Sequence, residues 1–244
     1  MPPSTHIDLF AGCGGISLGL HNAGWRGIFA IEKSKMAFET LKHNLIDEKN
    51  HFDWPDWLPV TEHDVSDILK GYRNELGNLR GSVDLVAGGP PCQGFSLAGR
   101  REEQDERNSS VDLYVEFISL VRPGALFFEN VKGFTIGFKS GDSRGEAYSN
   151  RVSRELRNLG YDVKGEEIDF SDFGVPQRRK RFILVGMLAE RAQEFFEKIT
   201  EVKEDFLKNK GLKEKVTLGE AISDLERKHG EVDSLESRNF KEGV

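Results

Sequence analysis

Short apolar runs alternate with amphipathic segments along most of this chain, and this alternation limits its fold more than any other feature. The amphipathic segments predict helices at Ile16–Ala23, Ser34–Asn44, Val111–Val121, Ala147–Leu159 and Ala189–Lys208. The apolar runs predict strands at Ile7–Phe10, Gly27–Ile31, Val60–His63, Val83–Ala87, Ala125–Phe128, Tyr161–Asp169 and Arg181–Met187. Strands that alternate with helices form βαβ units, so we expect an α/β fold with a doubly wound, mostly parallel, seven-stranded sheet.

The last two predicted strands differ from the others in how they are joined. Only about a dozen residues separate Tyr161–Asp169 from Arg181–Met187, which leaves no room for a crossover helix, so we expect an antiparallel pair. The charge-dense segment that follows is typical of a solvated helix. We therefore predict a domain over residues 1–187 and a helical C-terminal extension over residues 188–244, which would lead towards a further region.

Composition excludes several classes of protein. The chain has 34 Lys and Arg against 41 Asp and Glu, and its net charge of −7 argues against nucleic-acid binding over the whole surface, although a local basic groove remains compatible. No stretch approaches the roughly 18 consecutive apolar residues of a membrane helix, and no secretory signal pattern opens the chain. Cys13 and Cys92 lie far apart, so we expect no disulfide framework and no metal site. These features predict a reducing, cytoplasmic location.

A glycine-rich turn follows the first predicted strand, in Asp8-Leu9-Phe10-Ala11-Gly12-Cys13-Gly14-Gly15. Glycines there let the backbone approach a ligand, and the helix N-terminus after it suits a carboxylate or phosphate. Glu32 ends the second strand, where it would hold ribose hydroxyls, and Asp64 could accept a hydrogen bond from an adenine amino group. Neither a P-loop nor a GxGxxG pattern is present. S-adenosylmethionine fits this pattern better than a dinucleotide; a tight turn without a ligand is the alternative.

A stiff loop follows the fourth predicted strand, in Gly88-Gly89-Pro90-Pro91-Cys92-Gln93-Gly94-Phe95-Ser96. Open α/β sheets bind ligands at the carboxyl ends of their strands, so Cys92 would be presented in the site. A thiolate there could act as a nucleophile. The alternative is a buried, inert cysteine; for Cys13 we expect no chemistry.

Four motifs together resemble the C5-cytosine DNA methyltransferases: Asp8–Gly15, Gly89–Ser96, Glu129–Val131 and Gln177–Arg181. The resemblance covers residues 1–187 and reaches weakly to Thr217–Leu225. Amino-group methyltransferases carry an aromatic-ended Pro-Pro motif at the same place and need no cysteine. The resemblance implies a Rossmann-like fold that binds S-adenosylmethionine, with S-adenosylhomocysteine as the product.

The activity that the resemblance implies is methyl transfer to C5 of cytosine in duplex DNA. Cys92 would add to C6 of the ring, and Glu129 would donate a proton or hydrogen bond at N3. Of Arg179 and Arg181, one would lie near the cytosine O2 and the other towards DNA phosphate and the loop. Because a duplex buries C5 and C6, the base would be flipped out.

The segment after Cys92 exceeds twenty residues before the next predicted helix, about the length at which catalytic lids occur. Arg100 and Arg101 would give it a basic site, and we expect it to close over DNA. The resemblance implies further DNA contacts from Gln93, Ser96 and Gln177.

Cofactor contacts are also implied by the resemblance. Phe10 would lie against the adenine, and Lys33 stands where many relatives carry an aromatic or other bulky residue. The remaining contacts would come from Gly12 and Gly14 by the methionine moiety, Ala11 and Gly15 in the same turn, Glu32 on the ribose, Asp64 and Val65 at the adenine, and Pro91 and Leu113 along the wall.

Members of this family continue through a target recognition domain and a closing Asn-rich helix, and neither is visible after Leu225. We expect a second polypeptide that carries these parts, a shortened sequence or a degenerate member. The favoured function is modification beside a restriction endonuclease, on DNA in the nucleoid. The alternatives are an RNA cytosine methyltransferase of the tRNA-acting type and a catalytically incomplete subunit. The sequence gives no DNA target.

Overall fold

The computed structural model of this chain describes residues 2–91, 109–137, 139–140 and 143–223. It divides into two compact units. The first comprises residues 1–168 and 181–198, and the second comprises residues 169–180 and 199–244. The first unit holds nearly all of the sheet and most of the predicted site.

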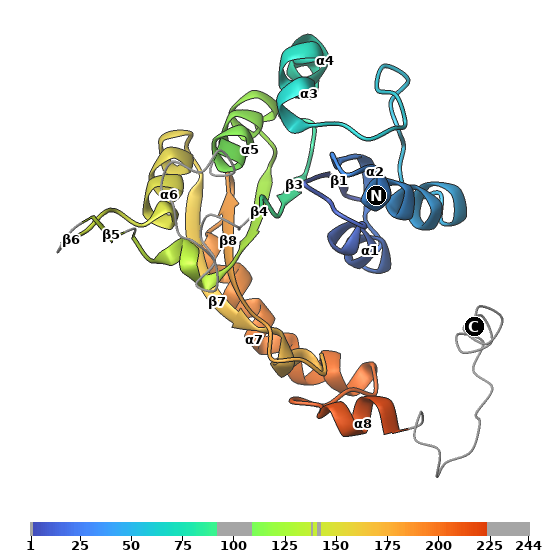
Figure 1. The fold of residues 1–244 in the computed structure, drawn as a ribbon, viewed down its shortest axis with the longest axis vertical. Coiled ribbons are helices and arrows are strands. Elements are labelled where there is room, and N and C mark those ends of the chain that lie inside the picture. The colour runs from blue at the N-terminus through green and yellow to red at the C-terminus, as the bar shows by residue number, and fades with distance from the viewer. Residues whose placement is uncertain (1, 92–108, 138, 141–142, 224–244) are drawn as a thin grey trace. The chain divides into compact units, whose positions relative to one another are not determined.

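A six-stranded sheet forms the centre of the first unit, in the order β2-β1-β3-β4-β8-β7 (Figure 1). Strands β1, β2, β3 and β4 pair in parallel, and β8 runs antiparallel to β4. Strand β7 lies beside β8, as the short connection between them predicted. The bounds are β1 Thr5–Leu9, β2 Arg26–Ile31, β3 Leu85–Gly88, β4 Ala125–Asn130, β7 Asp162–Asp169 and β8 Lys180–Met187. The α/β, mostly parallel fold is therefore confirmed.

The predicted strand Val60–His63 is wrong, so the main sheet has six strands within the described residues, not seven. Pro59 has no N–H to donate, and its carbonyl accepts from Thr61 N at 2.9 Å, which turns the chain. A backbone bond of 2.9 Å from His63 N to Glu32 O ties the segment to the end of β2, and Val60 is 41% exposed. A separate two-stranded antiparallel sheet is formed by β5 (Lys139–Ser140) and β6 (Ser143–Arg144).

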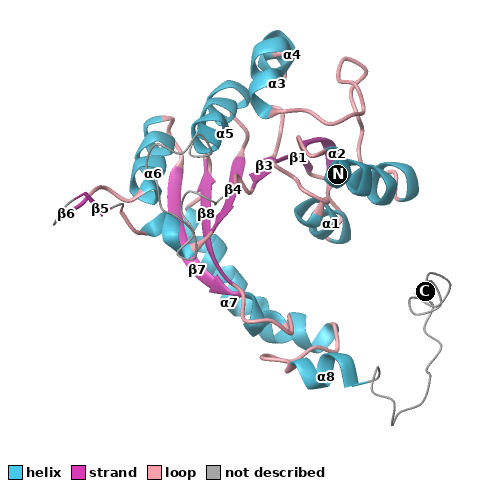
Figure 2. Ribbon diagram, in the orientation of Figure 1, coloured by secondary structure: helices cyan, strands magenta, loops and turns pink. Residues whose placement is uncertain are grey.

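Helices cover both faces of the main sheet (Figure 2). Phe128 packs against Tyr114 of α5 on one face, with ring centroids 5.2 Å apart, while its neighbour Phe127 meets Phe195 of α7 on the other. The helices of regular α form are α1 Gly15–Asn22, α2 Lys35–Leu41, α3 Val65–Gly71, α4 Arg73–Asn78, α5 Ser109–Val121, α6 Tyr148–Asn158, α7 Ala192–Asn209 and α8 Leu218–Ile222. A π-helical turn, η1 (Lys42–Glu48), continues α2, and 3₁₀ turns occupy Lys132–Thr135 and Phe170–Phe173.

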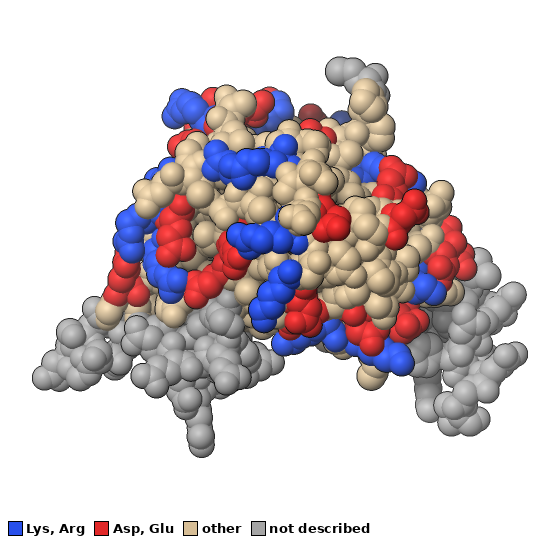
Figure 3. Space-filling model, turned by 90° about the horizontal axis from the view of Figure 1, so that it is seen from above, with Lys and Arg blue, Asp and Glu red and all other residues tan. Residues whose placement is uncertain are grey.

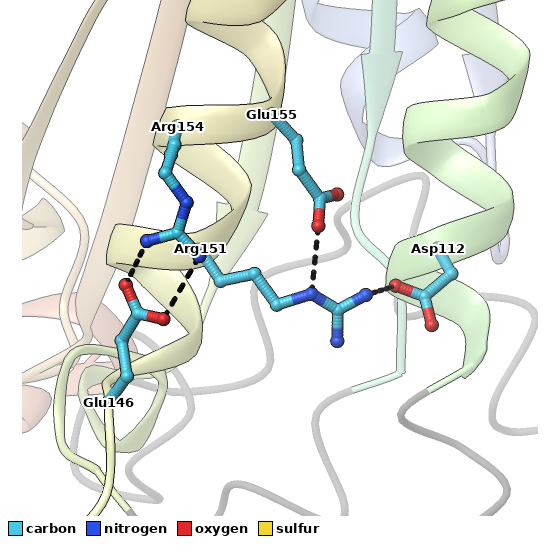
Figure 4. Close-up of polar contacts among 5 residues, drawn as sticks. All are labelled: Asp112, Glu146, Arg151, Arg154 and Glu155. Carbon is cyan, nitrogen blue, oxygen red and sulfur yellow. Dashed lines mark hydrogen bonds and ion pairs between the residues drawn. The ribbon is translucent and has the colours of Figure 1, made fainter.

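An ion-pair network ties α6 to α5 (Figure 4). Arg151 bonds Asp112 on α5 and, through Nε, Glu155 one turn along α6 at 2.9 Å. Arg154 pairs with Glu146 just before the helix. Because these groups are largely exposed, the network orients α6 more than it stabilises the fold, and the buried apolar core carries the stability.

The second unit is organised by local contacts. Gly174 has φ of 84°, and a Cβ there would lie 2.9 Å from Leu212 Cβ, so only glycine fits this turn. Lys203 pairs with Glu214 at 2.6 Å. Thr217 and Glu220 form a capping box at the start of α8. Within the described residues, no helix has the length and apolar character to cross a membrane.

Candidate active site

A cavity of about 420 Å³ opens where β1, β2 and β3 end, in the first unit. Six of the ten predicted cofactor residues line it: Phe10, Glu32, Asp64, Val65, Pro91 and Leu113. Ile31, Lys33, His63, Ser66, Gly89 and Ser110 complete the wall. Its size lies in the range of small-molecule sites, and a wall that combines apolar side chains with a few carboxylates suits a nucleoside.

The glycine turn has the backbone that its sequence predicted. Gly12 has φ of 55° and Gly14 has φ of 87°, both in the left-handed region that favours glycine. A Cβ on Gly14 would lie 2.7 Å from Leu45 Cδ1, so close packing also requires glycine there. Phe10 has φ of 56°, an unusual value for an aromatic residue, and lines the cavity. The turn is thus a strained and closely packed structure beside the cavity.

Glu32 fixes this turn to the end of β2. Its Oε2 accepts from Gly12 N at 2.9 Å and its Oε1 accepts from Ser34 N at 2.7 Å. A carboxylate oxygen can accept more than one hydrogen bond, so Glu32 retains capacity for ligand hydroxyls. The sequence predicted Glu32 as a site residue but gave no sign that it holds the turn, because that bond joins residues 20 positions apart in the chain.

Asp64 has a local role as well as a place in the cavity wall. Its Oδ1 accepts from Ser66 N at 2.8 Å and caps α3. Ser66 and His63 were missed by the sequence analysis, although an Asp before an apolar residue is a helix-start signal that could have located Ser66. His63 is held by the contact of its Nε2 with Pro59 O, at 2.9 Å.

Glu129, the predicted proton donor, is the last residue but one of β4 and lies beside Gly89. Its Oε1 lies 2.6 Å from Nε of Arg181, and both side chains are largely buried. A Cβ on Gly89 would lie 3.3 Å from Glu129 Oε2, so this glycine lets the loop pass close to the carboxylate. The structure thereby brings Glu129 and Arg181 together at the predicted site.

Asn130, at the end of β4, connects this strand to the segment at Pro90. Its Nδ2 donates to Pro90 O at 3.4 Å, a long hydrogen bond, and its Oδ1 accepts from Val131 N at 2.9 Å. The side chain is buried. Glu129 is therefore fixed relative to the chain two residues before Cys92.

Several predicted residues cannot be placed at this site. Cys92, Gln93, Ser96, Arg100 and Arg101 lie outside the described residues. Gln177 and Arg179 belong to the second unit and are exposed, and Arg179 O accepts from Phe170 N at 2.9 Å. Ala11, Gly12, Gly14 and Gly15 form the turn but are not among the residues that line the cavity. The roles of all these residues remain predictions.

Charge on the surface is mixed. Figure 3 shows Lys and Arg interspersed with Asp and Glu over the face that it presents. In the part of the chain that the structure describes, no cluster of three or more His, Cys, Asp or Glu side chains could hold a metal ion.

A family model and individual relatives indicate the same protein family for this chain. The model of the C-5 cytosine-specific DNA methylase family matches residues 4–242. Type II methyltransferase M.DdeI of Desulfomicrobium norvegicum is 36% identical over 222 residues, which are 90% of this chain and 48% of that protein. Type II methyltransferase M.AquIA of Picosynechococcus sp. is 34% identical over 231 residues, and the match covers 90% of this chain and 88% of that relative.

Solved structures share the fold. A prophage-encoded E. coli protein, described as a DNA modification methyltransferase, matches 75% of this chain and 46% of its own, with a TM-score of 0.55 and 28% identity. The Dnmt2 methyltransferase of S. pombe matches 80% of this chain and 54% of its own, with a TM-score of 0.57; at 19% identity it shows the fold alone. The chain spans about half the length of M.DdeI and less than half of two further Type II methyltransferases, M.XorII and M.AgeI. By its family model and by its relatives, the chain belongs to the C-5 cytosine-specific DNA methylases.

Proposed function

We propose that this chain transfers a methyl group from S-adenosylmethionine to C5 of cytosine in duplex DNA. The observation that carries the proposal is the carboxylate of Glu129, paired with Arg181 at 2.6 Å and fixed through Asn130 to the start of the Cys92 loop. This arrangement adjoins a loop whose Gly89 also lines the cavity. Family membership supports the same reaction.

The cavity residues fit the methyl donor. Glu32 would hold the ribose hydroxyls, Asp64 the adenine amino group, and Phe10 the face of the adenine. The turn at residues 11–15 would receive the methionine carboxylate beside the N-terminus of α1. When bound, S-adenosylmethionine supplies an electrophilic methyl group on its sulfonium sulfur. The wall of Pro91 and Leu113 would exclude water from the nucleoside.

Cys92 and Glu129 would activate the cytosine. Addition of the Cys92 thiolate to C6, with a proton or hydrogen bond from Glu129 at N3, makes C5 nucleophilic enough to accept a methyl group. Transfer of the C5 proton to water, return of the N3 proton to Glu129 and elimination of the Cys92 thiolate then restore the aromatic ring. Arg181 would orient the Glu129 carboxyl and reach the cytosine O2.

The target base would have to leave the duplex to reach this site. Arg100 and Arg101 would close over the DNA, Arg179 would contact phosphate, and Gln93, Ser96 and Gln177 would support the flipped state. Because many relatives are about twice as long as the matched region, we propose that sequence recognition comes from residues outside it, in the same or a companion polypeptide. The setting would be restriction and modification in the cytoplasm, beside an endonuclease.

Covalent trapping on duplex DNA that carries 5-fluorocytosine tests this proposal. Fluorine at C5 blocks the final elimination, so the enzyme should remain attached through Cys92 after denaturation, in the presence of S-adenosylmethionine. Cys92→Ser should give no adduct, whereas Cys13→Ser, at an exposed cysteine of the glycine turn, should still form one. The test runs on the chain alone and with the polypeptides encoded beside it. An adduct only on tRNA would show that the substrate is tRNA and not duplex DNA. No adduct under any condition would overturn the proposal.

A further inference from the structure

Asp8 has a carboxyl that the proposed mechanism does not use. It is fully buried in β1, and its Oδ2 accepts from Ser17 Oγ at 2.7 Å. Among the described residues, its Oδ1 has no hydrogen-bond partner. Its neighbours across the sheet are Ala30 and Ala87, whose side chains carry no polar group. A buried carboxylate oxygen without a partner is costly, so its retention in this position calls for an explanation.

The Asp8 carboxyl lies at the base of the glycine turn. Asp8 is two residues before Phe10, which lines the cavity, and Ser17 lies in the first turn of α1. The bond between Asp8 and Ser17 therefore closes the loop of chain that the turn forms. Asp8 is not among the residues that line the cavity, so its charge would act on a bound ligand across this turn.

The groups that act on Asp8 come from three elements. Glu32 at the end of β2 and Tyr114 on α5 interact with it electrostatically, and His6 precedes it on the same face of β1. Burial raises the pKa of Asp8 to about 7; Ser17 opposes this shift and the charge of Glu32 adds to it. The pKa of His6 is lowered to about 3 by burial and by His51, so His6 is neutral near pH 7.

We propose that the Asp8 carboxyl, held by Ser17 at the base of the glycine turn, makes this site favour the positively charged methyl donor over its neutral product. The inference rests on the proposed function. S-adenosylmethionine carries one positive charge more than S-adenosylhomocysteine, on the sulfonium. A nearby cation stabilises the ionised carboxylate, and in a buried setting this attraction is weakly screened. Binding of S-adenosylmethionine thus favours loss of the Asp8 proton, whereas binding of S-adenosylhomocysteine does not.

Affinities of both ligands for the intact chain, measured by isothermal titration calorimetry from about pH 5.5 to about pH 8.5, test the inference. The preference for S-adenosylmethionine over S-adenosylhomocysteine should rise by about tenfold across this range, the change that one unit of pKa shift produces. The ligands share their amino and carboxyl groups, and His63 lines the cavity for both. Asp8→Asn leaves all of these groups unchanged, so the difference between its pH dependence and that of the wild type isolates the contribution of Asp8.

Asp8→Asn keeps an acceptor for Ser17 and removes the charge, so its preference for S-adenosylmethionine over S-adenosylhomocysteine should rise much less with pH than that of the wild type. Asp56→Asn, at an exposed carboxylate, is the matched control and should behave as wild type. If Asp8→Asn fails to fold, the wild-type measurement still tests the inference, because a ratio that does not rise with pH contradicts it. Tight binding of both ligands with a ratio that does not change with pH overturns this inference and leaves the proposed function standing. Binding of neither ligand overturns the proposed function itself.

Discussion

The Nε atom of Arg181 lies 2.6 Å from Oε1 of Glu129, and the two side chains are only 22% and 28% exposed. Glu129 pairs in register with Ile183 of the antiparallel strand β8, so Arg181 reaches it from two residues along that strand. The pair therefore depends on the register of β4 against β8. A slip of one residue would turn Arg181 to the other face of the sheet and leave the carboxylate without its cation.

Arg181→Ala should lower the free energy of unfolding by about 1–2 kcal/mol, because it leaves a largely buried carboxylate without its charged partner. Urea unfolding followed by circular dichroism measures this. Arg73→Ala is the matched control, since Arg73 pairs with Glu116 at 2.9 Å but these side chains are 60% and 46% exposed. That variant should lose less than about 1 kcal/mol. Equal losses in the two variants would contradict the role given to burial.

Glu129→Gln should lower the rate of methyl transfer at least about 100-fold, because an amide cannot supply the proton that the cytosine N3 needs. Since Glu129 is not among the residues that line the cavity, the affinity for S-adenosylmethionine should stay unchanged. Single-turnover transfer of tritiated methyl groups and calorimetric binding separate the two effects. Loss of cofactor binding with normal transfer at saturation would assign Glu129 to the wrong step.

Local sequence patterns predicted much of this fold. The features that they did not predict depend on contacts between residues far apart in the chain. The apolar runs located the six strands of the main sheet, but Val60–His63 has the composition of a strand and no partner ladder. The short helices α3 and α4 were missed because so few residues show little periodicity. A local signal for α3 exists, since Asp64 precedes it as a capping residue.

In the candidate site, too, local motifs predicted individual residues but not the contacts between distant residues. The motifs located Glu32, Glu129 and Arg181 at one end of the sheet, yet gave no partner for any of them. The bond from Gly12 to Glu32 joins the turn after β1 to the residue after β2, and the pair of Arg181 with Glu129 joins β8 to β4. The buried state of Asp8 was missed for a similar reason, because its neighbours on β2 and β3 decide whether its oxygens find partners.

Glu32→Ala should weaken binding of S-adenosylmethionine by about tenfold or more, because it removes a charged acceptor that holds Gly12 and Ser34. Glu32→Gln, which keeps one acceptor oxygen, should lie between wild type and Glu32→Ala. Calorimetric titration measures both. Glu39→Ala, at an exposed glutamate on α2, is the matched control and should bind as wild type. Wild-type affinity in Glu32→Ala would exclude this carboxylate from the cofactor site.

Three histidines form a chain of close contacts on the α1 side of the sheet. His6 Nε2 lies 2.8 Å from His51 Nε2, and His51 Nδ1 lies 3.2 Å from His21 Nδ1. Burial and His51 lower the pKa of His6 to about 3. The pKa of His51 is lowered to about 4 by burial, His21 and Arg26, against the opposing charge of Asp53. The native chain therefore holds His6 and His51 neutral under conditions in which the unfolded chain protonates them.

This difference predicts a loss of stability as pH falls below about 6.5, the ordinary pKa of histidine, and the loss should continue towards pH 4. Each histidine contributes at most about 1.4 kcal/mol per pH unit. Asp8 offsets the effect of one histidine on the slope of stability against pH. Its pKa is raised to about 7, so the native state binds a proton on Asp8 that the unfolded state has lost above about pH 4. The net slope of stability against pH should therefore correspond to one proton more bound by the unfolded state than by the native state.

Urea unfolding at a series of pH values between about 7.5 and about 4.5 measures this slope. His51→Gln removes one of the two titrating histidines, so the slope in that variant should fall close to zero. His43→Gln, at an exposed histidine on η1, should leave the wild-type slope unchanged. A wild-type stability that stays constant over this range, or an unchanged slope in His51→Gln, would show that the buried histidines do not control the acid sensitivity of the fold.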